Sequence, residues 1–449
     1  MGSRKSRFGW ATIGAVLILC AAGVSSASAM DVTSFSLDPS TKQAAGHPDV
    51  TVSISFDTQF GEDVRDLTLD FPPGLIGNPE TKSKCSASQF QRDNCSSSSS
   101  VGSTVVIARA LGLPLPVPGS VYLLQPEPAD AATLGIVLRA TGGLPIVGKI
   151  YVVAHITAVR NGDGDYFLRT SIRNLPTTAR AVLGLLPVPI TLERMNLTLK
   201  RSGNASNTYF LTNPTGCQPA VSNVEAVSDQ NDTDTAQSSF TPTGCGSVPF
   251  TPAFDFQSST TQAGAKTATT ATITVPGNEH PLRQSHVKSV QLKFPPGMGM
   301  DILAAFGFDV CSDAAFAADT CGAGSDLGNA SAAVPPLPPS FTGDVYRVNP
   351  PSGELYGFGV VLRGPRGIKA IMRGGASLTS VPTPEGIVVQ LIAQFQGLPQ
   401  IPFTSFQLAI TNPLFVNSPT CVTRSAQAIL GGWSGASATL SDPYTTTGC

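Results

Sequence analysis

Side chains that usually carry chemistry are scarce in this sequence. It holds 4 His and 2 Trp among 449 residues, and only 13% of its residues are charged. No stripe of Lys and Arg is present to neutralise phosphates, which argues against nucleic acid as a partner. After position 29 no stretch approaches the ~18 uncharged apolar residues of a membrane-spanning helix, so we expect no membrane span in the mature chain.

Local catalytic signatures are also lacking. No G-x-S-x-G nucleophile elbow occurs, and Gly432-Trp-Ser-Gly435 is one residue short of one. None of the four histidines recurs at a matched position of the repeat described below: His47, His155, His280 and His286. Two carboxylates that meet only in three dimensions stay open as glycoside-hydrolysing machinery. The sequence therefore leans away from an enzyme without deciding the question, and it nominates no catalytic residue.

The first 29 residues have the layout of a secretory signal peptide. Basic residues at positions 4, 5 and 7 precede an apolar run over 11–24, and Ala27-Ser-Ala29 fits a cleavage site. We expect a mature chain from about Met30 that is secreted or held in the cell envelope. Retention of the segment as an anchor stays open. Without it the chain has 25 Lys and Arg against 30 Asp and Glu, a net charge of −5.

One strand-like segment occurs twice and organises the rest of the chain. Leu67-Thr-Leu-Asp-Phe-Pro-Pro-Gly74 recurs as Val290-Gln-Leu-Lys-Phe-Pro-Pro-Gly297, 223 positions later. Apolar residues alternate in both copies, which is the period of a half-buried strand, and Pro-Pro-Gly ends it. Further segments match, and we align Thr212-Asn-Pro214 with Thr411-Asn-Pro413. The sequence therefore predicts a tandem duplication.

Eight cysteines lie beyond the signal segment, and their spacing repeats with the two copies. Each copy has one pair 10 residues apart and one pair 28 residues apart. The short pair encloses a predicted helical turn, capped by Ser86 or Ser312, with Gln89 completing a capping box in the first copy alone. Zinc is the competing interpretation, but no C-x-x-C pair supports it. A duplicated module should pair its cysteines identically and within itself, which predicts the disulfides Cys85–Cys95, Cys217–Cys245, Cys311–Cys321 and Cys421–Cys449.

The fold class follows from many short alternating segments and from 44 Gly and 37 Pro. These features predict an all-β protein of two tandem β-sandwich modules, jelly-roll-like or immunoglobulin-like, stapled by disulfides. We place the first module at 30–245 and the second at 246–449. The linker Gly246-Ser-Val-Pro249 is too short for independent tumbling, so we expect the modules to pack side by side.

Ten residues of the first copy, Thr177 to Leu186, have no counterpart in the second. The insertion is apolar, so it either covers the edge of its own sheet or forms an interaction patch. The residues of that possible patch are Val182, Leu183, Leu185 and Leu186.

Asn161, Asp163 and Asp165 place oxygen atoms at alternate positions, as the start of a calcium loop does. Tyr166 stands where the turn glycine of such a loop belongs, so an ordinary hairpin turn is the competing interpretation. Calcium is thus a weak candidate, and no other metal or cofactor is expected. A repeated arginine at a strand end, Arg139 or Arg363, predicts a structural ion pair or a binding residue.

The pattern Phe71-Pro-Pro-Gly-Leu-x-Gly-Asn-Pro79, followed by Cys-x9-Cys and then Phe210-Leu-Thr-Asn-Pro-Thr-x-Cys217, resembles secreted tandem-repeat proteins of soil actinobacteria. The resemblance spans nearly the whole mature chain and is stronger in the first copy. It implies export and the two-module layout, and it carries no activity.

Two functional hypotheses follow from the sequence. The first is a non-catalytic secreted or cell-envelope protein that uses its tandem modules for interaction or adhesion, with an unknown extracellular or cell-wall partner. The alternative is an extracellular glycan-binding or glycoside-hydrolysing protein. Sugar sites present flat aromatic faces, and Trp433 is the candidate for one, with packing beneath a disulfide as the competing role.

Overall fold

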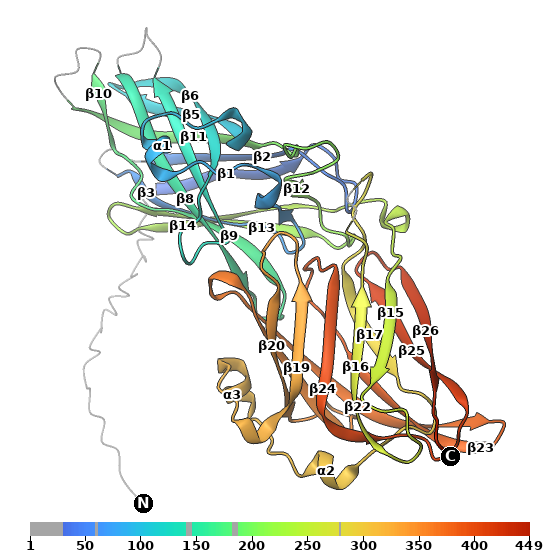
Figure 1. The fold of residues 1–449 in the computed structure, drawn as a ribbon. Helices are drawn as coiled ribbons and strands as arrows, with labels where there is room; N and C mark the ends of the chain where they lie inside the picture. The colour runs from blue at the N-terminus through green and yellow to red at the C-terminus, as the bar shows by residue number, and fades with distance from the viewer. Residues whose placement is uncertain (1–29, 59–61, 141–145, 182–186, 278–279) are drawn as a thin grey trace, which may run out of the picture.

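The computed structural model describes residues 30–58, 62–140, 146–181, 187–277 and 280–449. Strands dominate this part of the chain and form two large antiparallel sheets, one for each copy of the repeat (Figure 1). Module 1 denotes the described residues up to 245, and module 2 denotes those from 246 onward. The all-β fold of two tandem, disulfide-stapled sheet modules is confirmed.

Module 1 is built from strands with short helical turns between them. Its strands are β1 (Met30–Pro39), β2 (Val50–Thr58), β3 (Val64–Asp70), β4 (Ile76–Gly77), β5 (Ser100–Ala110), β6 (Leu113–Leu124), β7 (Ala132–Ala140), β8 (Ile146–Arg160), β9 (Tyr166–Ile172), β10 (Thr178–Ala181), β11 (Pro187–Leu199), β12 (Leu211–Thr212), β13 (Ala220–Ser228) and β14 (Thr233–Phe240). Its helical elements are α1 (Ala87–Gln91) and the 3-10 turns η1 (Pro79–Thr81), η2 (Ser97–Ser99) and, at the border of the modules, η3 (Cys245–Ser247).

Module 2 repeats this plan. Its strands are β15 (Ala253–Ser258), β16 (Lys266–Thr274), β17 (Val287–Lys293), β18 (Gly299–Met300), β19 (Asp326–Ala333), β20 (Phe341–Val348), β21 (Tyr356–Arg363), β22 (Lys369–Thr383), β23 (Gly386–Phe395), β24 (Ser405–Val416), β25 (Thr423–Gly432) and β26 (Ser437–Thr445). Its helical elements are α2 (Ile302–Phe306), α3 (Asp313–Ala318), η4 (Ala323–Ser325) and η5 (Pro365–Gly367).

The two sheets have the same strand order. The path β1-β2-β11-β5-β6-β7-β8-β9-β3-β13-β14 corresponds strand by strand to β15-β16-β24-β19-β20-β21-β22-β23-β17-β25-β26. Each sheet folds over so that its first and last strands lie side by side. Side chains join these strands: the Leu37 amide donates to Ser238 Oγ (3.0 Å), and the Phe256 amide donates to Asp442 Oδ2 (2.7 Å). Each module is thus a single sheet that folds over its own main hydrophobic core.

Alternation along the strands places one face in each core. On β2 the buried residues are every second one, Val50, Val52, Ile54 and Phe56, as the apolar period predicts. Strands β7 and β21 depart from this rule, because nearly every residue on them is buried. Their second face is covered by the disulfide-bounded helical turn of each module.

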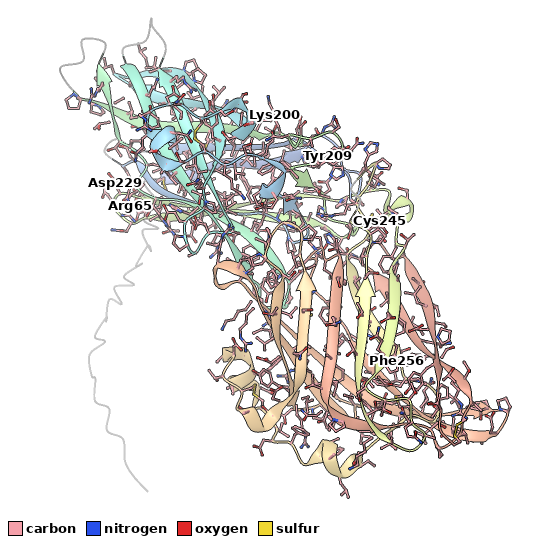
Figure 2. The ribbon with its side chains drawn as sticks, viewed as in Figure 1. Arg65, Lys200, Tyr209, Asp229, Cys245 and Phe256 are labelled. Atoms are coloured by element: carbon pink, nitrogen blue, oxygen red, sulfur yellow. A yellow bond between two sulfur atoms is a disulfide. The ribbon has the colours of Figure 1, made fainter. Side chains whose placement is uncertain are left out.

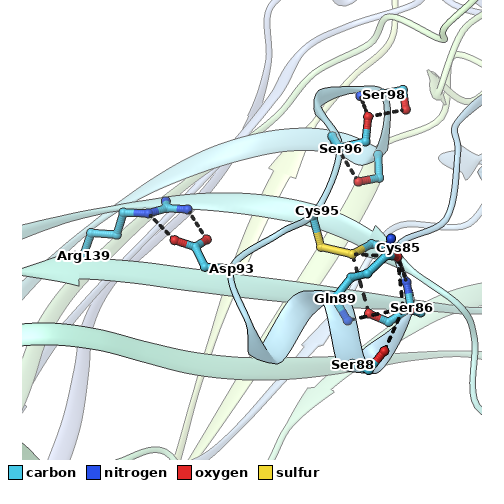
Figure 3. The surroundings of a disulfide bond; sticks show 10 residues. Cys85, Ser86, Ser88, Gln89, Asp93, Cys95, Ser96, Ser98 and Arg139 are labelled. Atoms are coloured by element: carbon cyan, nitrogen blue, oxygen red, sulfur yellow. Dashed lines mark hydrogen bonds and ion pairs between the residues drawn. A yellow bond between two sulfur atoms is a disulfide. The ribbon is translucent and has the colours of Figure 1, made fainter.

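Figure 3 shows this turn in module 1. Ser86 caps α1 by accepting from the Gln89 amide, and Gln89 Oε1 accepts from the Ser86 amide, so the predicted capping box is present. The ring of Phe90 packs on β7 beside Gly135, where an added Cβ would lie 2.5 Å from a ring carbon. Glycine is required there because the ring approaches the backbone so closely. In module 2 the same contact joins the Phe316 ring to Gly359.

An arginine clamps each of these turns to the sheet. Arg139 and Lys149 both contact the carboxylate of Asp93, at 2.6 and 2.7 Å. In module 2 Arg363 and Lys369 bind the carboxylate of Asp319, whose side chain is 5% exposed. Hydrogen bonding to Lys149 and Arg139 lowers the pKa of Asp93, and Arg363 with Lys369 lowers the pKa of Asp319. The repeated arginine is therefore a structural ion-pair residue.

The structure corrects the alignment of the Asn-Pro motif. Asn213 is fully buried and its Nδ2 donates to the carbonyls of Thr41 and Gln43. The residue that makes the same two bonds in module 2 is Asn417, which donates to Thr260 O and Gln262 O. Asn412 lies five residues earlier, inside β24. A shared Thr-Asn-Pro triplet suggested the wrong register, because the carbonyls that the amide must reach are distant in the sequence.

This asparagine site leads to a paired prediction. Asn417 Oδ1 accepts from the Tyr444 hydroxyl at 2.7 Å, whereas Asn213 Oδ1 is buried without a hydrogen-bond partner. Strand register makes Phe240 the module 1 counterpart of Tyr444. We expect Phe240→Tyr to stabilise the protein by about 1 kcal/mol, because it supplies the missing donor, and Tyr444→Phe to destabilise it by about 1–3 kcal/mol. Urea unfolding followed by circular dichroism measures both, and a destabilised Phe240→Tyr variant would contradict the pairing.

Candidate binding site at the module junction

The modules meet at their ends. The loop between β8 and β9 reaches down to module 2, at the end where β16 and β19 finish (Figure 1). There the Tyr166 hydroxyl donates to Lys369 O (2.6 Å), and Arg366 donates to Ala131 O (2.7 Å). The expected side-by-side packing is therefore wrong. The interior of module 2 opens at this end, so apolar residues of module 1 cover it.

The predicted calcium-loop residues lie in the same loop. Asn161 Oδ1 accepts from the Asp165 amide at 2.8 Å, which closes a turn. The carboxylate of Asp165 accepts from the Gln400 amide (2.8 Å) and from Gln400 Nε2 (3.2 Å), so it joins the two modules. Asp163 is exposed at the tip. Within the described residues no group of three or more His, Cys, Asp or Glu side chains lies close enough together to hold a metal ion. Calcium binding stays a prediction, which a melting curve with chelator tests.

Three of the four unduplicated histidines gather at the junction. The ring of His47 stacks on Tyr209 with centroids 3.7 Å apart, and the Tyr209 hydroxyl lies 2.8 Å from His280 Nδ1. Figure 2 shows Tyr209 in the same half of module 1 as Cys245, the residue that ends this module. The backbone amide of His286, in module 2, donates to Thr215 Oγ1 of module 1 (3.2 Å). These histidines have no counterparts because each module contributes a different end to the contact.

His286 is the most perturbed titratable group at the junction. Its side chain is 3% exposed, and the backbone of Gln400 is the hydrogen-bonding group that acts on its ring. Burial, with the positive charge of Arg283 as a second cause, lowers the pKa of His286 to about 3. The imidazole of the folded protein is therefore neutral at pH 7.

This histidine predicts a loss of stability in mild acid. The folded pKa of His286 lies below the ordinary value of 6.5. Its full contribution to the free energy of unfolding is therefore present above pH 6.5. Below that pH the contribution falls, because the unfolded chain binds a proton at this residue and the folded chain does not. Unfolding free energy should drop by about 1.4 kcal/mol per pH unit below 6.5, or about 2 kcal/mol between pH 7 and 5. His286→Asn should flatten this dependence in urea titrations at pH 5, 6 and 7. Equal slopes for the two proteins would refute the assignment.

An apolar cavity of about 190 Å³ lies at the junction, and residues from both modules enclose it. Module 2 supplies most of the wall from the inner face of its sheet. Module 1 covers the end. The module 1 residues of the wall include Leu75, Pro79, Ala131, Ala158, Tyr166 and Phe210. A smaller cavity of about 70 Å³ occupies the equivalent end of module 1, where β10 pairs with β11 and β8.

The other predicted residues have the following places. The structure joins Cys85 to Cys95, Cys217 to Cys245, Cys311 to Cys321 and Cys421 to Cys449, which are the pairs that the spacing predicts. Val182, Leu183, Leu185 and Leu186 lie outside the described residues, as does the signal segment. Trp433 is half-buried: its Nε1 donates to Leu398 O (3.0 Å), and Lys288 lies over its ring. These contacts give it a packing role beside the junction.

Comparisons with known proteins add little to this picture. No family model matches the chain, and no curated protein matches it. Among solved structures, a tetra-tandem repeat from the extending region of a large adhesion protein is 8% identical over 93% of this chain and 99% of that one, with a TM-score of 0.13. A likeness at that level supports no argument. No helix in the described ranges is long and apolar enough to cross a membrane. The fold and the junction thus define an all-β, disulfide-linked tandem-module protein.

Proposed function

We propose that this is a non-catalytic interaction protein, exported to the cell exterior or envelope, that associates with a second copy through the free end of module 2. The four disulfides suit an oxidising compartment. The resemblance to secreted repeat proteins of soil actinobacteria supports export as well. The association surface is suggested by one observation, an exposed apolar patch at the end of module 2 that lies away from module 1.

The distal patch lies on α2 and on the hairpin of β22 and β23, both far from module 1 in Figure 1. Leu303 is 88% exposed and Ile387 is 79% exposed, values that are unusual for such large apolar side chains. The patch consists of Ile302, Leu303, Phe306, Leu355, Leu378, Ile387 and Val389.

The repeat indicates what such a surface binds. By position and strand register, Ile302, Leu355, Leu378 and Val389 correspond to Pro79, Ala131, Ala158 and Tyr166. All four of these module 1 residues line the junction and are buried or half-buried against module 2. The distal patch is therefore the unpaired copy of a surface that already binds a sheet module within this chain. Within the chain that surface contacts the opposite end of the next module. Between two copies we propose instead that the patch is buried against itself, because a twofold contact is the commonest arrangement of two identical chains.

Light scattering coupled to size exclusion tests the proposal. We expect a dimer at micromolar concentration, and a monomer for Leu303→Asp combined with Ile387→Asp, because each places a charge in an apolar contact. Leu113→Asp is the control, since Leu113 is 58% exposed on β6 of module 1. If the wild-type protein is still a monomer at a 100-fold higher concentration, the proposed association through the distal patch is wrong. A reducing-sugar assay on cell-wall polysaccharides decides the alternative, because turnover would show a glycoside hydrolase.

A further inference from the structure

The cavity at the junction has a cause that can be read from the repeat. Strand register pairs Leu138 with Ile150 in module 1 and Leu362 with Ala370 in module 2, so Ala370 stands where module 1 has an isoleucine. The same comparison on other strands gives three further substitutions of this kind. The four pairs are Ala271 for Val52, Ala332 for Val106, Ala370 for Ile150 and Ala428 for Val224. All four alanines line the cavity.

Aromatic side chains form the rest of the changed wall. Phe341 corresponds to Val117, Phe395 to Ile172 and Phe406 to Met195, again by strand register. All three rings line the cavity. The corresponding side chains of module 1 are branched or flexible and leave a smaller cavity of about 70 Å³, whereas module 2 has small side chains between flat ring faces. Protein interiors are normally close-packed, so an open volume built by several concerted differences points to a binding site rather than to loose packing.

The polar groups at the mouth of the cavity are already engaged with one another. The Tyr166 hydroxyl donates to Lys369 O, and the Lys369 ammonium lies 2.7 Å from Asp319. The Gln400 amide groups donate to the Asp165 carboxylate. None of these groups is directed to a charged or polar ligand. A ligand held here would have to bind by apolar contact alone.

We propose that the cavity between the modules binds a small, uncharged, apolar molecule, and that the alanines at 271, 332, 370 and 428 make room for it. The volume of about 190 Å³ suits a compact ring compound. An apolar cavity of about 150 Å³ in another protein stays dry and binds benzene, which sets the scale. Because module 1 supplies one wall, occupancy also links the two modules. This inference is independent of the proposed association through the distal patch.

Toluene and benzoate form the first test, because they share a ring and differ in charge. Calorimetry and melting temperature of the mature chain should show saturable 1:1 binding of toluene with an increase in melting temperature, and no binding of benzoate. Absence of toluene binding, or equal binding of benzoate, would overturn the proposal. Xenon provides a second probe, since a bound ¹²⁹Xe resonance is expected in the wild-type protein and its absence also counts against the cavity.

Variants that restore the module 1 side chains provide the second test. Ala332→Val combined with Ala370→Ile should weaken toluene binding at least tenfold, with a melting temperature equal to or above that of the wild type. Ala253→Val is the matched control, because Ala253 is exposed at the start of β15, and it should bind as the wild type does. If the double variant does not fold, Ala428→Val replaces it. Unchanged affinity in a folded, filled variant would refute the site.

Discussion

Replacing Arg363 by methionine is expected to destabilise module 2 by about 3 kcal/mol. Asp319 is 5% exposed, and its carboxylate is bound by Arg363 and Lys369. Methionine retains much of the side-chain packing but removes the main counter-charge, and a buried charge that loses its partner costs about 3–5 kcal/mol. Loss of the clamp should also free the disulfide-bounded turn, because Asp319 ends α3.

Urea unfolding followed by the fluorescence of Trp433 measures this effect, since Trp433 belongs to module 2. The pKa of Asp319 is lowered, so its contribution is present above the ordinary value of 3.8 and is lost as the pH falls through the lowered value. The difference in unfolding free energy between the Arg363→Met variant and the wild type should therefore become smaller in strong acid. Arg160→Met is the control, because Arg160 is exposed at the end of β8. A similar loss in both variants would show that the clamp has no special role.

Removing the bridge between Cys421 and Cys449 is expected to have the second large effect. A crosslink across 28 residues lowers the conformational entropy of the unfolded chain, which stabilises the folded protein by about 3.5 kcal/mol. The double serine variant should also loosen β26, whose contact with β15 includes the hydrogen bond from the Phe256 amide to Asp442. Chemical denaturation and limited proteolysis together measure stability and the opening of this edge.

The short bridge between Cys311 and Cys321 gives the comparison. Its loop of 10 residues should contribute about 2.7 kcal/mol, and the arginine clamp holds the same turn independently. We therefore expect the double serine variant of Cys311 and Cys321 to lose less unfolding free energy than the double serine variant of Cys421 and Cys449. In the first variant β26 should stay resistant to protease. The reverse order of stabilities would contradict this account of the two bridges.

Much of the fold could be predicted because it rests on local patterns that occur twice. Alternation on β2, the Pro-Pro-Gly strand end and the capping box at Ser86 are each set by a few neighbouring residues. The junction could not be predicted in this way, because its contacts join residues far apart in the sequence, as Asp165 and Gln400 are. Its best sequence signal was the set of histidines without counterparts, which marks an environment that the duplication does not repeat.

The cavity illustrates the same limit. Each alanine that lines it looks ordinary in the sequence, because alanine is common in strands and turns alike. Its meaning appears only when strand register sets Ala370 against Ile150 and Ala332 against Val106. The Asn-Pro misalignment had the same origin, since a repeated triplet was given more weight than the carbonyls that the buried amide must reach.

The long bridges also determine how each module would respond to tension along the chain. Cys217 and Cys245 enclose β13 and β14, and Cys421 and Cys449 enclose β25 and β26, which are the last strands of each sheet. Force applied along the polypeptide would pass through each disulfide instead of through the hairpin that it encloses. About 95 Å of chain length in each module therefore could not be extended while the disulfide is intact.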